Sequence, residues 1–280
     1  MGEEANRPAR WFVPMAALAL IAAVGVLLAR GPIPQDPSYH AFADHRTLLG
    51  VPNLLNVLSN LPFMVFGIAG LTVVRGERST GLLRELRPAY TCFFAGSACV
   101  AIGSAIYHLD PNNLSLVWDR LPMTIAFMSF FAIVIGEHVG PEAGRRLLPP
   151  LLMVGPASVL YWWFTEARSA GDLRFYGLVQ FLPLVLIPLI LGLYRSLLTR
   201  VHLVWLVLVT YAIAKLFELY DAPIYARIGV SGHTLKHLAA SAGVLLFLVA
   251  VRTRTVREDS GRLRAVTRAS ARSLRRRARR

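Results

Sequence analysis

Residues 233–251 read HTLKHLAASAGVLLFLVAV, in which two histidines four residues apart open an apolar run of almost spanning length. A helix needs about 20 predominantly apolar residues to cross a bilayer. In such a helix His233 and His237 lie on one face, one turn apart. An ionisable side chain within a membrane span is costly and by default indicates a functional site. The stretch therefore predicts a membrane helix with two chemically active side chains near its start.

Apolar runs of this length recur along the 280-residue chain, which is 55% hydrophobic and only 16% charged. This composition is too apolar for an ordinary soluble domain. The candidate spans cover residues 11–29, 54–75, 89–108, 117–137, 147–164, 174–194, 202–219 and 233–251. We therefore expect an all-α integral membrane protein with a seven-helix core and one additional N-terminal transmembrane helix.

The first run could instead be a secretory signal peptide, because Arg7 and Arg10 precede it. It is long for such a peptide, and the RGPIP that follows does not resemble a small-residue cleavage site, so an uncleaved span is favoured. The expected organisation is an N-terminal helix in 1–35, the seven-helix membrane domain in 36–251 and an Arg-rich tail in 252–280.

The arginines predict an orientation. They gather before the first run, in alternate connections, and in the tail, where twelve arginines face only Glu258 and Asp259. All of these segments fall on one side of an eight-span bundle, and positively charged connections remain in the cytoplasm. Both termini are therefore expected there, and the YWWF of residues 161–164 would form an aromatic belt at the outer interface.

The overall charge of +14 comes largely from this tail. A basic segment after the last span is most simply cytoplasmic and lipid-facing. Nucleic-acid binding is the alternative and is less favoured. The expected partners are the bilayer and a lipid, with no nucleic acid.

A third histidine, His108, ends an outward-running span in the segment SAIYH. Because the span that begins with His233 runs inward, all three histidines are expected at the same, non-cytoplasmic end. Three imidazoles with an open fourth position form the ligand set of a catalytic zinc ion. The alternative is that the histidines only bond to interfacial loops, but a pair at i,i+4 and a third at matching depth favour zinc bound by His108, His233 and His237.

Two further residues, Asp119 and Ser104, could take part in the chemistry of this site. Asp119, in WDRLPM, could cap a helix before Pro122 and pair with Arg120. Alternatively, its carboxylate accepts the proton of a zinc-activated water molecule. Ser104 lies one turn before His108, where it either packs between helices or polarises a substrate carbonyl.

Polar residues also gather at the outer start of the second run, namely Asn53, Asn56, Ser59 and Asn60. A spanning helix rarely tolerates so many without partners, so they predict an interhelical hydrogen-bond network. With Asp36 or Asp44, they could instead ligate a hard cation through oxygen.

Charged residues close the seventh run. Lys215 and Glu218 at i,i+3 can pair, which lowers the cost of both, and together with Asp221 they are interpreted as support for the site. Lys236 is expected to snorkel or to pair with an acid. A transporter that uses these groups as a relay is the alternative, but the two halves of the chain show no internal repeat.

In combination, these residues resemble the alkaline ceramidase family over roughly residues 36–251. The resemblance is carried by Ser104-x-x-x-His108, by Asp119 eleven residues later, by His233-x-x-x-His237 and by Asn56-x-x-Ser59-Asn60. This family belongs to a wider group of seven-span metal-dependent hydrolases, with the adiponectin/progestin receptors and Per1-type proteins. The Arg-rich chain, with only two lysines, suggests a bacterial member in the inner membrane.

The resemblance implies that the three histidines bind zinc, that Asp119 acts on the zinc-activated water and that Ser104 stabilises the oxyanion. The implied reaction is hydrolysis of a lipid amide, ceramide giving a sphingoid base and a fatty acid. Eukaryotic relatives carry an acid-rich calcium segment. Here its counterpart, YHAFAD, offers Asp44, and Asn53 stands where an acid is expected, which weakens the case for calcium.

Three alternatives stay open at this stage. The substrate could be another membrane lipid, since many high-GC bacteria make little sphingolipid. The protein could be non-catalytic with a structural zinc ion. It could also be receptor-like, although no sizeable soluble domain outside the core supports that reading.

Overall fold

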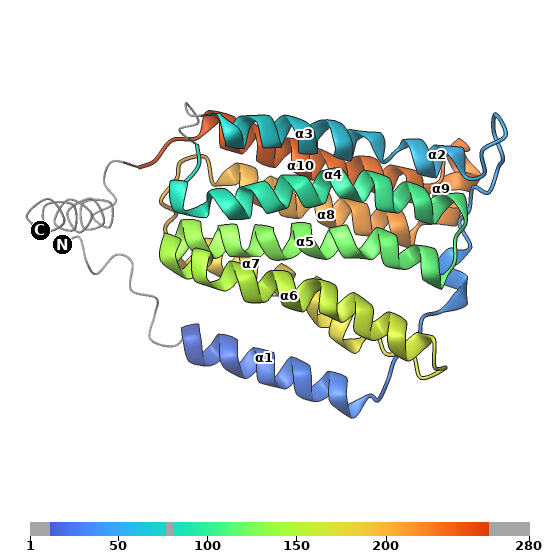
Figure 1. Cartoon of the computed structure of the whole chain (residues 1–280), viewed down its shortest axis with the longest axis horizontal. Helices are drawn as coiled ribbons and strands as arrows, with labels where there is room; N and C mark the ends of the chain where they lie inside the picture. The colour runs from blue at the N-terminus through green and yellow to red at the C-terminus, as the bar shows by residue number, and fades with distance from the viewer. Residues whose placement is uncertain (1–11, 77–80, 258–280) are drawn as a thin grey trace, which may run out of the picture.

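The computed structural model describes residues 12–76 and 81–257, and these form helices that run side by side along the long axis of the molecule (Figure 1). The helices are α1 (Phe12–Ala29), α2 (Leu54–Leu58), α3 (Leu61–Arg75), α4 (Arg87–Leu109), α5 (Asn113–His138), α6 (Pro141–Glu166), α7 (Arg174–Leu193), α8 (His202–Leu219), α9 (Asp221–Ile228) and α10 (Gly232–Thr253). Two short 3-10 helices, Pro37–His40 and Arg84–Leu86, precede α2 and α4.

Within the described residues, seven helices are long and apolar enough to cross a membrane, with α2 and α3 together forming the span Leu54–Arg75. This confirms the all-α membrane core. The apolar part of α1 is Leu20–Ala29, which is shorter than the roughly 20 residues that a crossing needs. The eighth span therefore stays a prediction, and Arg7, Arg10 and residues 258–280 of the tail lie outside the described ranges.

Successive spans run in opposite directions, so the connections gather at two ends. The segment before α2 lies at one end together with α9 and the start of α10 (Figure 1). Two arginines at this end are neutralised locally, since Arg46 pairs with Asp44 at 2.7 Å and Arg174 with Asp172 at 2.8 Å. The pairing is consistent with the predicted asymmetry of charge, while the orientation in the membrane remains a prediction.

The centre of the bundle is α5, whose candidate span is 72% buried, against 17% for α8. The helix is capped by Asn112, whose side chain accepts hydrogen bonds from the backbone N–H groups of Leu114 and Ser115. Asp119 therefore does not cap a helix, because it lies well inside α5. The alternative based on capping is wrong.

Pro122 lies inside α5 and has no N–H group for the carbonyl of Trp118, one turn earlier. Gly103 of α4 packs directly on that carbonyl, where a Cβ atom would collide with it. The small residue thus lets α4 approach α5 closely one turn from His108. This close approach is what brings the side chains of the two helices together at the site.

The predicted aromatic belt is wrong at one position. Tyr161, Trp163 and Phe164 are partly exposed, as a belt requires, but Trp162 is fully buried inside the bundle. The four residues span about a full helical turn, so they cannot all face the same side.

A buried ion pair lies at the end of the bundle opposite the histidines. Arg254 reaches Glu137 of α5 at 3.0 Å, and Tyr90 donates a hydrogen bond to the same carboxylate at 2.6 Å. Arg254 also donates to the carbonyl of Gly81 at 2.6 Å. The sequence predicts this arginine in the basic tail, but its side chain is 1% exposed, so it belongs to the bundle and does not face lipid.

We expect Glu137→Ala to lower the free energy of unfolding by about 3–5 kcal/mol, because it leaves the Arg254 guanidinium buried without a counter-charge. The matched control is Glu142→Ala, which breaks exposed pairs with Arg145 and Arg146 and should cost about 1 kcal/mol or less. Unfolding in neutral detergent measures both. Equal losses in the two variants would contradict the structural role assigned to the buried pair.

Candidate metal centre

Three buried histidines from two helices meet at the end of the bundle that holds α2 and α9. His108 is in the last turn of α4, and His233 and His237 occupy the first two turns of α10. One ring nitrogen from each can be chosen so that all three lie within 4.8 Å of one another. No other group of three or more His, Cys, Asp or Glu side chains has this geometry in residues 12–76 and 81–257.

The donor set fits a metal ion. Nε2 of His108 and Nε2 of His237 lie 3.3 Å apart, and a tetrahedral ion with metal–nitrogen bonds of about 2.0–2.1 Å would hold its ligands about 3.3–3.4 Å apart. Nε2 of His233 is buried and has no hydrogen-bond partner among the described residues. A buried nitrogen without a partner is costly, and a metal ion at this position would relieve that cost.

Polar residues at the break between α2 and α3 hold the side chain of His237. Ser59 donates its hydroxyl proton to the carbonyl of Asn56 at 3.0 Å, which leaves its oxygen to accept from Nδ1 of His237 at 2.8 Å. When Nδ1 carries the proton, the ligating lone pair is on Nε2, which faces His108 and the metal position. Residues that orient a ligand in this way tune metal affinity. Asn60 donates to the same Asn56 carbonyl at 2.7 Å.

The backbone of the other two histidines is also held. Asn53 donates to the carbonyl of His108 at 2.9 Å, and Asp221 accepts from the backbone N–H of His233 at 3.0 Å. Asn56 accepts a hydrogen bond at 2.6 Å from Thr234 of α10. The network predicted for the polar residues of the second run is therefore present, and it includes Thr234, which the sequence interpretation did not single out.

We expect Ser59→Ala to weaken metal binding about 10- to 100-fold, because His237 loses the acceptor that fixes its tautomer. The control is Ser241→Ala, in the same helix as His237, whose buried hydroxyl bonds only to the carbonyl of Leu238. Competition with a chromogenic chelator measures the affinity. An unchanged affinity in Ser59→Ala would contradict the supporting role.

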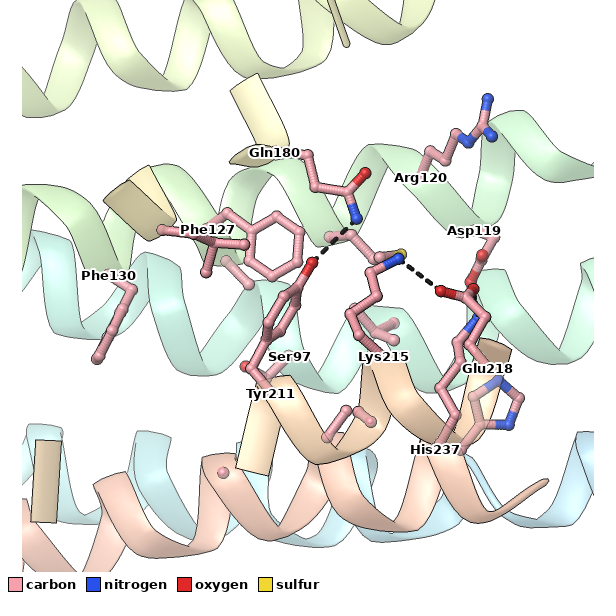
Figure 2. A pocket seen from close by; sticks show the side chains of 18 of the residues that line it. Ser97, Asp119, Arg120, Phe127, Phe130, Gln180, Tyr211, Lys215, Glu218 and His237 are labelled. Atoms are coloured by element: carbon pink, nitrogen blue, oxygen red, sulfur yellow. Dashed lines mark hydrogen bonds and ion pairs between the residues drawn. The ribbon is translucent and has the colours of Figure 1, made fainter. Parts of the chain in front are cut away.

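Asp119 and Ser104 lie together on the wall of a cavity of about 380 Å³. Both side chains are buried. Of the three histidines, only His237 lines this cavity, and Figure 2 shows Asp119 and His237 on the same side of it. The metal position would therefore be open to the cavity at the side that carries the carboxylate and the hydroxyl.

Three further charged residues, Lys215, Glu218 and Lys236, line the same cavity, and Figure 2 shows Glu218 on the same side as Asp119 and His237. Lys215 pairs with Glu218 at 2.5 Å, as the sequence predicted, and Lys236 pairs with the other carboxylate oxygen at 2.6 Å. These three residues form no hydrogen bond or ion pair with the histidines, whereas Asp221 accepts a hydrogen bond from the backbone of His233. Much of the remaining wall is apolar and includes Phe93, Phe127, Phe130, Leu184, Ile187 and Val244.

Phe42, which the sequence did not reveal, covers the histidines from the connection before α2. Its ring centre lies 4.4 Å from that of His233 and 4.8 Å from that of His108. A single apolar residue in a loop has no periodicity to mark it. Its packing excludes water from the side of the histidines that faces away from the cavity.

Asp44, the candidate calcium ligand, is occupied by a neighbour. Both carboxylate oxygens accept hydrogen bonds from the guanidinium of Arg46, at 2.8 Å and 2.7 Å. The hydrogen bond to Arg46 lowers the pKa of this carboxyl below its usual value. Calcium binding at Asp44 would require Arg46 to be displaced.

A model of the ceramidase family matches residues 44–270. This chain belongs to the ceramidase family. Enzymes of this family are amidases that act on ceramide. The matched segment of the ceramidase family includes all seven candidate spans and the three histidines. A search of curated proteins found no match.

Proposed function

We propose that this member of the ceramidase family is a zinc-dependent intramembrane hydrolase of a lipid amide, with ceramide or a close analogue as substrate. The observation that carries the proposal is the convergence of three buried histidines beside Asp119 and Ser104 at one end of an apolar cavity. Zinc suits three imidazole ligands with an open fourth position. When bound, it would polarise the amide carbonyl and acidify a water molecule.

The chain would supply the remaining steps. Asp119 would take the proton from the attacking water and deliver it to the nitrogen of the leaving amine, as a general base and then a general acid. Ser104 would donate a hydrogen bond to the carbonyl oxygen as negative charge develops there. Because Asp119 and Ser104 line the same cavity as His237, both side chains would act on an amide bound there.

The cavity fits a lipid rather than a small polar substrate. Most of its lining residues are aromatic or aliphatic, and His237, Asp119 and Ser104 are among the polar ones. An acyl chain would lie along the apolar part and place its amide beside Asp119. Because the site is enclosed by helices of spanning length, the substrate would enter from the membrane. We further propose that this site faces the periplasm, that both termini are cytoplasmic and that α1 forms an eighth span.

The test is release of fatty acid from long-chain ceramide by purified protein in neutral detergent, before and after removal of metal by a chelator. We expect turnover that the chelator abolishes and that zinc restores. A protein that binds zinc but releases no fatty acid would overturn the assignment of ceramide. It would then direct attention to other acyl-amide lipids or to a structural role of the metal.

A further inference from the structure

Arg120 is a buried cation that the proposed reaction does not use. Its side chain is 5% exposed, and it lines the same cavity as Asp119 and His237. One guanidinium nitrogen, Nη2, donates to the side-chain oxygen of Gln35 at 2.7 Å. The other, Nη1, is buried and has no hydrogen-bond partner within the described part of the chain.

Aromatic rings hold the guanidinium in place. Its carbon lies 4.3 Å from the ring centre of Trp162, 4.6 Å from that of Tyr176 and 5.5 Å from that of Tyr39. Such contacts stabilise a desolvated cation, and they leave the N–H groups at the edge of the guanidinium plane to bind oxygen. This is the arrangement that positions arginine for a carboxylate or phosphate.

No carboxylate neutralises this cation. The neighbouring Asp119 points toward His237, whereas the Arg120 side chain extends in the opposite direction (Figure 2). Among the described residues, Arg120 forms no ion pair, and Glu218 is already shared between Lys215 and Lys236. The cavity wall therefore carries three cations, Arg120, Lys215 and Lys236, and two carboxylates.

We propose that Arg120 binds an anionic group on the amine side of the lipid substrate, a carboxylate, phosphate or sulfonate. The inference rests on the proposed amidase function and adds to it a preference for anionic acyl-amide lipids over neutral ceramide. The amide would lie beside Asp119, the acyl chain among the apolar residues, and the anion at Nη1 of Arg120. A buried cation with an unused donor is costly to maintain without a ligand, and this ligand supplies the missing charge.

Binding can be tested without hydrolysis, using tetradecyl phosphate as an anionic probe and tetradecanol as its neutral counterpart. We expect the phosphate to raise the midpoint of thermal unfolding of the wild type in maltoside detergent. Arg120→Gln should weaken this binding about tenfold or more, because it removes a charge-assisted hydrogen bond. Arg168→Gln removes an exposed arginine that does not line the cavity and should leave the binding intact.

A second variant tests the proposal independently, in case Arg120→Gln does not fold. Gln35→Glu keeps the guanidinium and its aromatic contacts but places a carboxylate beside it, so it should also weaken binding of the phosphate. The metal content of each variant reports whether the bundle is folded. Binding of tetradecyl phosphate as tightly by both variants as by the wild type would overturn the proposal.

Kinetics then identify the source of the anion. The ratio of kcat/KM for ceramide 1-phosphate to that for ceramide should fall about tenfold or more in Arg120→Gln. Equal losses for both substrates would assign Arg120 to positioning Asp119 and overturn the proposal. An unchanged ratio with weaker inhibition by free fatty acid would show that Arg120 binds the released acid, which also overturns it. If neither lipid is hydrolysed, the amidase proposal fails, while the binding assay still tests the anion site.

Discussion

Replacing His237 with alanine is expected to remove the bound metal and to lower kcat/KM for the amide substrate by about a thousandfold or more. His237 is the one histidine of the three that lines the cavity, and its Nε2 lies 3.3 Å from Nε2 of His108. Its loss therefore removes both a ligand and the part of the centre that faces the substrate. Lewis-acid polarisation by a metal contributes several kcal/mol to a hydrolytic transition state, which corresponds to a factor of this size.

The measurement pairs metal content, determined on the purified protein, with release of fatty acid. His202→Ala is the control, because His202 is exposed at the start of α8 and belongs to no metal group. It should keep both metal and activity. Full metal content in His237→Ala would contradict the ligand assignment, and full activity without metal would contradict the proposed mechanism.

Asp119→Asn is expected to keep the metal but to lower kcat by about 10²- to 10⁴-fold, the usual contribution of a general acid–base residue. The amide has the shape of the carboxylate, but it cannot accept and return a proton. Asp119 is not among the side chains that form the metal group. The loss should therefore appear in kcat, with the metal content unchanged.

The control for charge is Asp110→Asn, an exposed residue just beyond α4 that does not line the cavity. It should leave kcat within about twofold, as expected for a surface change away from the site. Near-wild-type turnover in Asp119→Asn would remove Asp119 from the mechanism. A parallel loss of metal would instead show that the carboxylate helps to build the metal site.

The cluster of three histidines was predictable because its geometry is largely local. His233 and His237 share a helical face at any i,i+4 spacing, and the arginine pattern places His108 at the same end of the bundle. The polar residues of the second run were predicted as a network for a similar reason, since unpaired amides are costly in a membrane. Their particular task, holding Nδ1 of His237 through Ser59, required the break between α2 and α3.

Other errors came from contacts between distant segments. The alternative that pairs Arg120 with Asp119 is wrong, because adjacent residues of a helix point in different directions and Arg120 stacks on Trp162 of α6. The sequence predicts Trp162 at the interface, because nothing in the stretch 161–164 marks one of its four aromatic rings as buried. Arg254 was assigned to the tail because its partner, Glu137, is more than a hundred residues away.

The sequence by itself determined the membrane class, the seven spans and the candidate ligands, because the thickness of a bilayer and the pitch of a helix act on short stretches of chain. Only the tertiary structure decided where the cavity lies, which histidine faces it and which cations remain unpaired. Those features depend on how α4, α5 and α10 pack against the connection before α2. Packing of this kind depends on the shapes of many side chains at once, and these side chains come from segments far apart in the sequence.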